Sequence, residues 1–343
     1  MPLLHFSDLD QPGFRLTRKG RRVTVVSPDG SAVTDPGILQ RVEALAIPPA
    51  WTDVWICSDP CGHLQATGRD AKGRKQSRYH PDFRAERERT KFDQLVHFGD
   101  LLGPLRTRVA RDLSERRPTE RRQLPLVVHL LDRTGIRIGN EVYTKTNGSY
   151  GLSTLRTRQA IVHGADITFR FVGKSGRKHS VTVEDRRLAR MVAQCQDLPG
   201  QRLFVYLDAE GQARTIDSAQ VNAYLRDVTG TDATAKTFRT WIATSSASAH
   251  LALDLGTRAG RPTKQAFLRA IDHAAERLGN TRSVCRNSYV HPAVEQTYLG
   301  GEFDDVWRSG PSRPTAGMTT AERRTLHLLR TAGDGCASIE PAA

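Results

Sequence analysis

The stretch ITFRFVGKSGRKHSVTV, residues 167–183, interrupts a long helical region and decides how the chain is expected to fold. Apolar residues alternate with polar ones over 167–171 and again over 181–183. Alternation with a period of two is typical of half-buried strands. The glycine-bounded segment VGKSGR between them predicts a tight turn. We therefore expect a β-hairpin with Lys174 at its tip.

Helical periodicity surrounds this hairpin. From Phe92 onward, apolar residues recur three and four positions apart, which is typical of helices with one buried face. Glycines mark two helix ends, a break near Gly135 and a C-cap at Gly279. The sequence Thr319-x-x-Glu322 predicts a capping box at the start of a last helix. Three segments show the periodicity most clearly: 128–147, 217–228 and 263–279.

The first eighty residues predict β structure instead. FRLTRKGRRVTVV (14–26) has the pattern of a hairpin, and VWIC (54–57) with HLQAT (63–67) predicts a second one. The expected fold class is therefore α+β, with a small, mostly antiparallel β domain before a larger, mainly helical domain that carries the inserted hairpin. We place the β-rich domain with a basic linker at 1–90, the helical domain at 91–332 and a disordered tail at 333–343.

The junction between these domains is strongly basic. GRDAKGRKQSRYHPDFRAERERTK (68–91) holds nine Lys and Arg residues against four acids, with an aromatic residue among them. Such a run can be a solvated, flexible linker. It can also be a strand or loop that contacts nucleic acid and leads into a helix, which the excess of five positive charges favours. The DNA contacts expected here are Arg69, Arg74, Lys75, Gln76, Arg78 and Tyr79.

Composition narrows the class of protein. The 343 residues carry a formal net charge of +14, with a sequence pI near 10.0, so we expect a polyanionic partner, nucleic acid first. No run of eighteen apolar residues occurs and the first ten residues do not read as a secretory signal, so neither a membrane span nor secretion is expected. An anionic membrane surface ranks second to nucleic acid as the polyanionic partner, and the expected partner is DNA, with no membrane. The five scattered cysteines predict free thiols in a reducing cytoplasm.

The residues available for chemistry exclude several enzyme classes. The sequence has no G-x-x-x-x-G-K-[ST] motif, no H-E-x-x-H and no paired Asp cluster, so we expect neither a nucleotide cofactor nor a metal. For a protein that handles phosphate, arginine, lysine and a side-chain nucleophile remain. Arginine forks bidentately onto phosphate and stays charged, and lysine can protonate a leaving alkoxide. A tyrosine nucleophile would need cationic neighbours, because its ordinary pKa is about 10.

Four ordered blocks resemble the motifs of type IB DNA topoisomerases, in particular the small bacterial, poxvirus-like branch. They are LDRTGIRIGNEVYTKTNGSYGLSTLR (131–156), FVGKSGRKH (171–179), TAKTFRTWIATSSA (234–247) and LGNTRSVCRNSYVHP (278–292). The resemblance spans roughly 68–292, and 68–80 fits the end of that family's N-terminal domain. The presence of all four blocks in this order is a more specific sign of the family than any single block.

The resemblance implies a set of catalytic residues. Arg137 and Arg239 would clamp the phosphate, and Lys174 would be the general acid that protonates the leaving 5′ oxygen. Tyr289 would be the nucleophile that forms a covalent 3′-phosphotyrosyl link. Taken singly, each residue fits a structural role better: a surface salt bridge, a solvated turn lysine, an arginine that covers Trp241, a half-buried tyrosine. Together and in this order, they favour the catalytic role.

One position departs from the pattern of the family. Many members have histidine nine residues before the tyrosine, where this chain has Asn280. An amide can donate a hydrogen bond to a phosphate oxygen but does not titrate near neutral pH. The phosphate-stabilising role therefore survives the exchange, and a general acid or base role does not. Tyr143 falls where the family has a phosphate-contacting tyrosine.

The resemblance implies a topoisomerase that relaxes supercoiled duplex DNA without ATP, as a monomer that encircles the DNA, in the bacterial cytoplasm and nucleoid. Two alternatives stay open. A tyrosine recombinase or integrase shares this catalytic set, although such enzymes usually begin with a helical domain and have H-x-x-R where this chain has Lys236-x-x-Arg239. The other is a basic DNA-binding protein without enzymatic activity.

Overall fold

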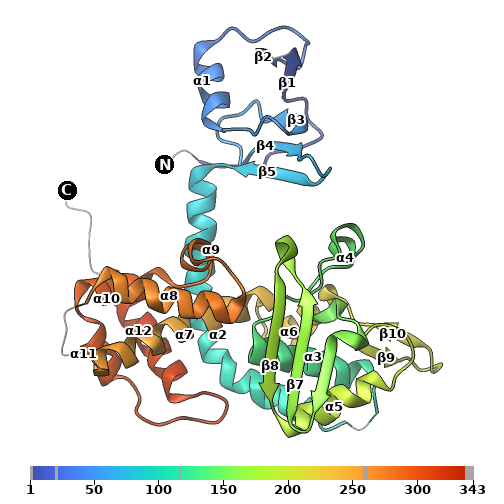
Figure 1. The fold of residues 1–343 in the computed structure, drawn as a ribbon. Helices are drawn as coiled ribbons and strands as arrows, with labels where there is room; N and C mark the ends of the chain where they lie inside the picture. The colour runs from blue at the N-terminus through green and yellow to red at the C-terminus, as the bar shows by residue number, and fades with distance from the viewer. Residues whose placement is uncertain (1–2, 20–21, 116, 258–261, 337–343) are drawn as a thin grey trace. The chain divides into compact units, whose positions relative to one another are not determined.

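The computed structural model describes residues 3–19, 22–115, 117–257 and 262–336. The chain divides into two compact units, Met1–Asp93 and Gln94–Ala343, and the boundary falls inside one long helix. The expected α+β class is confirmed, because the first unit is built on an antiparallel sheet and the second is mainly helical (Figure 1). Among the described helices, none has both the length and the apolar character that a membrane crossing requires.

The first unit is a five-stranded antiparallel sheet with one helix packed on it. The strand order is β2-β1-β3-β4-β5, and both predicted hairpins are present. The core joins strand residues such as Phe14 and Ile56 to Val42 of the helix. The elements are β1 (Phe14–Lys19), β2 (Arg22–Val26), α1 (Pro36–Ala44), β3 (Thr52–Ile56), β4 (Leu64–Arg69) and β5 (Lys75–Tyr79).

The prediction of β structure for this unit missed one helix. The helix α1 was not expected, although Asp35 is a clear N-cap whose side chain accepts from Ile38 N at 2.9 Å and Pro36 fits the first helical position. For the basic segment, the structure agrees with the favoured alternative of a strand that leads into a helix, because the segment forms β5 and the first turns of the long helix α2 (Pro81–Asp112). Pairing with β4 satisfies the backbone groups along one edge of β5, which a solvated linker would leave to water.

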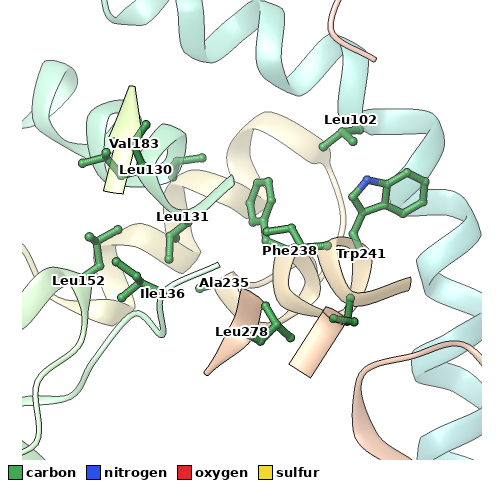
Figure 2. Packing of buried hydrophobic residues seen from close by; sticks show 14 of the residues in the cluster. Leu102, Leu130, Leu131, Ile136, Leu152, Val183, Ala235, Phe238, Trp241 and Leu278 are labelled. Carbon is green, nitrogen blue, oxygen red and sulfur yellow. The ribbon is translucent and has the colours of Figure 1, made fainter. Parts of the chain in front are cut away.

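The second unit surrounds a large apolar core (Figure 2). Phe238 and Trp241 fill its centre and lie close to Leu278 (Figure 2). The remaining helices are α3 (Glu120–Thr134), α4 (Glu141–Asn147), α5 (Arg186–Gln196), α6 (Ser218–Thr229), α7 (Ala235–Thr257), α8 (Lys264–Leu278), α9 (Arg282–Ser288), α10 (Pro292–Gly300), α11 (Phe303–Ser309) and α12 (Thr320–Cys336), with 3-10 turns η1 (Leu152–Thr154), η2 (Thr157–Gln159) and η3 (Lys174–Gly176).

The β insertion is larger than predicted. The expected hairpin is β7 (Asp166–Val172) and β8 (Lys178–Glu184), joined by η3 with Lys174 in it. A third strand, β6 (Ala160–His163), pairs with β7, and α5 and α3 pack against the sheet. A separate ribbon is formed by β9 (Val205–Leu207) and β10 (Ala213–Thr215).

The predicted helix ends hold in this unit. Gly135 and Gly279 both adopt the left-handed conformation as C-caps, with φ of 63° and 60°. Thr319 N donates to Glu322 Oε2 at 2.9 Å and Glu322 N donates to Thr319 Oγ1 at 3.2 Å, which is the expected capping box. The predicted tail at 333–343 is partly wrong, because α12 continues to Cys336. Residues 337–343 lie outside the described residues.

Candidate active site

Arg137 lies in the loop between α3 and α4. Gly135 ends α3 in the left-handed conformation, and a short loop then leads to Asn140, which caps α4. Leu152 N donates to the Arg137 carbonyl at 2.8 Å, which fixes the loop backbone. The guanidinium of Arg137 donates to Asn280 Oδ1 across 143 positions of sequence. A loop residue thus points at the turn after α8.

Arg239 comes from the buried helix α7 and is only 3% exposed. Its Nη1 donates to the carbonyl of Gly135, and its Nη2 donates to the carbonyl of Leu278 and to Asn280 Oδ1, both at 3.2 Å. Burial and the neighbouring charge of Arg137 lower the pKa of Arg239 to about 10. The side chain therefore remains a cation at neutral pH, held at fixed places by three oxygen atoms.

Asn280 follows the left-handed Gly279 and is 9% exposed. Its backbone N donates to the Ala275 carbonyl at 2.8 Å, which locks the turn after α8. Its Oδ1 accepts from both Arg137 and Arg239, whereas its Nδ2 is buried and has no hydrogen-bond partner among the described residues. A buried donor without a partner is costly, so this amide is poised to donate to a ligand oxygen.

Tyr289 ends α9, the short helix that the sequence did not predict. Its backbone N donates to the Cys285 carbonyl at 2.9 Å, and its carbonyl accepts from Thr244 Oγ1 of α7 at 3.2 Å. The guanidinium carbon of Arg239 lies 5.0 Å from the centre of the phenol ring. Burial raises the pKa of Tyr289, but the cations of Arg239 and others outweigh it, and the pKa falls below its ordinary value. A more acidic phenol is a better nucleophile at neutral pH.

Lys174 is exposed in the η3 turn, where the next residue, Ser175, has a φ of 63°. It lines a cavity of about 320 Å³ together with Arg137 and Arg239. Tyr289 and Asn280 do not line this cavity, but both contact Arg239. The structure therefore brings the five predicted residues into one region of the second unit, centred on Arg239. Among the described residues, no three His, Cys, Asp or Glu side chains gather as a metal site would require.

Comparisons with known proteins identify the family. Residues 80–299 match the family model for the catalytic core of eukaryotic DNA topoisomerase I, and residues 24–70 match the model for the N-terminal domain of bacterial DNA topoisomerase IB. DNA topoisomerase 1B of Acanthamoeba polyphaga mimivirus is 32% identical over 259 residues, which cover 74% of this chain and 77% of that protein.

The chain belongs to the type IB DNA topoisomerase family.

A likeness to a solved structure adds nothing to this conclusion. A XerH site-specific recombinase, bound to palindromic difH substrate in a post-cleavage complex, aligns with a TM-score of 0.36 and 16% identity. The alignment covers 57% of this chain and 49% of that one, and it supports no argument about the fold. The match of the first unit to a topoisomerase IB domain separates the chain from the recombinase alternative.

Most of the DNA contacts expected in the first unit lie on the hairpin of β4 and β5. Asp70 binds two of them, accepting from Arg74 Nε at 2.7 Å and from Gln76 Nε2 at 2.9 Å. Arg78 lies 5.5 Å from the centre of the Trp51 ring. Asp70 thus neutralises part of the predicted positive surface, which charge counting along the sequence could not reveal. The others are Arg69, whose Nη1 donates to the Gly73 carbonyl at 3.0 Å, Lys75, which is exposed, and Tyr79, which stacks on Phe83.

In the second unit, the remaining expected contact, Tyr143, is 56% exposed on α4 beside Val142, which is 64% exposed. An apolar residue and a phenol that both face solvent on a seven-residue helix suit a surface that contacts a partner. The DNA contacts in both units stay predictions.

Sequence reasoning missed His179, which lines the same cavity as Lys174. Its ring stacks on Phe171 with centroids 4.9 Å apart and an angle of 9° between the planes. The signal was available, because His179 extends the alternation of Val181 and Val183 and so faces the same way as these residues.

Proposed function

We propose that the chain relaxes supercoiled duplex DNA by cutting and rejoining one strand through a covalent bond between Tyr289 and the 3′ phosphate. The observation that carries this proposal is the contact of Tyr289 with the buried Arg239, whose charge makes the phenol more acidic. The family supports a topoisomerase reaction, and this contact indicates which side chain performs it.

The cleavage step uses each residue of the site once. Tyr289 Oη bonds to the phosphorus, its proton leaves to solvent, and the bond from phosphorus to the 5′ oxygen breaks. Negative charge grows on the non-bridging oxygens, where Arg137, Arg239 and the Asn280 Nδ2 donate hydrogen bonds. Each fixed donor of this kind is worth about 10²–10³ in rate. Lys174 gives its proton to the leaving 5′ oxygen, which contributes about 10²–10⁴.

The covalent link explains how the reaction can proceed without nucleotide hydrolysis. The phosphotyrosine ester replaces one phosphodiester bond by another of similar energy. The free 5′-OH end rotates about the intact strand, attacks the phosphotyrosine and restores the DNA backbone, while Tyr289 takes back a proton. The torsional strain of the DNA drives the rotation, so no cofactor is needed in the scheme.

We also propose that the protein acts as a monomer that encircles the duplex, in the cytoplasm and on the nucleoid. The net charge of +14 supports a polyanionic partner. Lys and Arg contacts with phosphate release counterions, so binding should weaken steeply as salt rises.

Relaxation of a supercoiled plasmid in EDTA without ATP tests the function. The wild type should relax the plasmid and form a protein–DNA adduct that maps to Tyr289. Tyr289→Phe should abolish both while it still binds DNA, because it removes only the nucleophilic oxygen. Tyr206→Phe is the matched control, since Tyr206 lies on β9 and accepts only a 3.5 Å contact from Gln220. Relaxation by Tyr289→Phe, or an adduct at another residue, would overturn the assignment.

A further inference from the structure

The turn end of the β7–β8 hairpin packs against the turn that carries Asn280. His179 makes this contact, because its ring lies between two glycines from different elements. A Cβ added at Gly279 would lie 2.2 Å from His179 Cε1, and one added at Gly173 would lie 2.7 Å from His179 Cδ2. These distances leave no room for a side chain at either glycine. The ring therefore fills the space between Gly173 of the hairpin and Gly279 at the end of α8.

A second contact joins the same two elements. Arg177, which follows the η3 turn, donates from Nη1 to the Gly279 carbonyl at 3.3 Å. Gly279 directly precedes Asn280, whose Oδ1 holds Arg137 and Arg239. The segment with the general acid and the segment with the phosphate donors thus meet at one residue, Gly279.

We propose that His179 is a positioning residue for the cleavage reaction, whose ring sets Lys174 at its place relative to Asn280 and the two arginines. The proposal rests on the proposed function, in which Lys174 is the general acid. Lys174 needs such support because its side chain is exposed on a turn, where burial does little to fix it. A proton donor displaced by about 1 Å can cost about 10² in rate.

The ring acts by its shape rather than by its charge. Burial lowers the pKa of His179, and the nearby cations Arg137, Arg239 and Arg177 lower it further. The imidazole is therefore neutral at neutral pH, and its flat face lies on Phe171. A neutral imidazole could instead donate directly to the phosphate, and the two roles predict different responses to the leaving group.

The test compares single-turnover cleavage of two DNA substrates, one with the ordinary 5′ oxygen and one with sulfur at that position. A thiolate leaves without a proton, so a defect in general acid catalysis disappears on the sulfur substrate. We expect His179→Ala to slow cleavage of the oxygen substrate about 10- to 100-fold and to cleave the sulfur substrate at nearly the wild-type rate. His179→Phe keeps a flat ring and should recover most of the loss.

Two further variants complete the design. The double variant Lys174→Ala/His179→Ala should be no slower than Lys174→Ala alone, because the histidine acts through the lysine. His163→Ala is the control, since His163 is exposed at the opposite end of the same sheet and should leave cleavage unchanged. Equal losses on both substrates, or a phenylalanine variant as slow as the alanine variant, would overturn the proposal in favour of a direct phosphate contact.

Gly279→Ala gives an independent check in case His179→Ala does not fold. The new Cβ would push against the histidine ring, so cleavage should fall and adding His179→Ala should slow it no further. Gly230→Ala is its match, because Gly230 has a φ of 66° as the C-cap of α6 but meets nothing within 4 Å. If Gly279→Ala and Gly230→Ala change the cleavage rate equally, the packing of His179 against Gly279 does not position Lys174. If the wild type makes no Tyr289 adduct at all, the proposed function fails instead.

Discussion

Replacing Asn280 by aspartate should stabilise the fold and at the same time destroy DNA cleavage. Asn280 Oδ1 accepts hydrogen bonds from Arg137 and Arg239, while Nδ2 is buried without a partner among the described residues. A carboxylate has almost the same shape, so it would keep the two arginine contacts and turn them into ion pairs. It would also place an acceptor and a negative charge where the amide offers a donor.

The expected loss follows from two terms. A carboxylate about 4 Å from a phosphate charge, at an effective dielectric constant of about 20, costs about 4 kcal/mol, or about 10³ in rate. The lost hydrogen bond to the charged phosphate adds about 1.5–3 kcal/mol. Asn280→Ala loses only the second term and should be about 10- to 100-fold slower than the wild type. Activity should therefore rank wild type, alanine, aspartate.

The melting temperatures of the variants should follow a different order from their cleavage rates. In Asn280→Ala, two guanidinium groups lose a shared acceptor and face each other's charge, so the melting temperature should fall. In Asn280→Asp, two ion pairs form in a site that already exists, so the melting temperature should exceed that of the alanine variant. Desolvation of the carboxylate limits the gain to a few kcal/mol at most.

Single-turnover cleavage and thermal melting of the three proteins decide the matter. Asn222→Asp is the matched control, because Asn222 Oδ1 accepts only from Ala235 N, at 3.1 Å, and has no arginine pair. That variant should change neither measurement much. An Asn280→Asp protein that cleaves as fast as Asn280→Ala would refute the placement of this amide against the phosphate.

Two further predictions concern pH. Since the pKa of Tyr289 lies below its ordinary value, the single-turnover cleavage rate should rise with pH and level off below pH 10. Lys236→Ala should move the inflection of this rate profile to higher pH, because Lys236 is one of the cations that lower the pKa of Tyr289. An unmoved inflection would contradict this. Glu322 accepts from Arg106 at 2.8 Å and its pKa is lowered in the fold, so its contribution to stability is present above the unfolded pKa of about 4.3 and disappears as pH falls through the folded value. Glu322→Gln should lower the free energy of unfolding, measured by urea denaturation, by about 3 kcal/mol at pH 7 and by much less in acid. Asp304→Asn, which breaks an exposed ion pair with Arg308, should lower it by less than about 1 kcal/mol. Equal losses in the two variants would refute the argument.

The sequence predicted those parts of the fold that local rules determine. The hairpin with Lys174 at its tip follows from period-two alternation around a glycine turn, and the left-handed Gly279 follows from its place after an apolar helical stripe. The third strand β6 was missed because it is only four residues long and its pairing with β7 is not encoded in either strand alone. The helix α1 was missed because β periodicity on both sides outweighed a single N-cap signal at Asp35.

The active site shows the same difference between features that local sequence determines and features that depend on distant contacts. The identities of its residues could be proposed from ordered motifs, but their contacts could not, because these join positions far apart in the chain. Arg239 illustrates the limit. Its position beside Trp241 on an apolar helix fits an arginine that covers an aromatic surface, yet the side chain is buried and donates to two carbonyls and an amide. His179 packs against Gly279, a glycine 100 positions away, and no local pattern reveals this contact.

The burial of Arg239 is itself explained by where two helices end. Its guanidinium donates to the carbonyl of Gly135, the C-cap of α3, and to that of Leu278, the last residue of α8. Carbonyls at helix C-termini lack partners within the helix and carry the negative end of the helix dipole, so they stabilise a cation that burial would otherwise penalise. Because both helices end in a left-handed glycine, the two carbonyls are fixed before any substrate binds. The cation that lowers the pKa of Tyr289 is therefore oriented by the fold. In the proposed reaction it need not be reorganised as charge grows on the phosphate, which is the condition under which a fixed charge contributes most to catalysis.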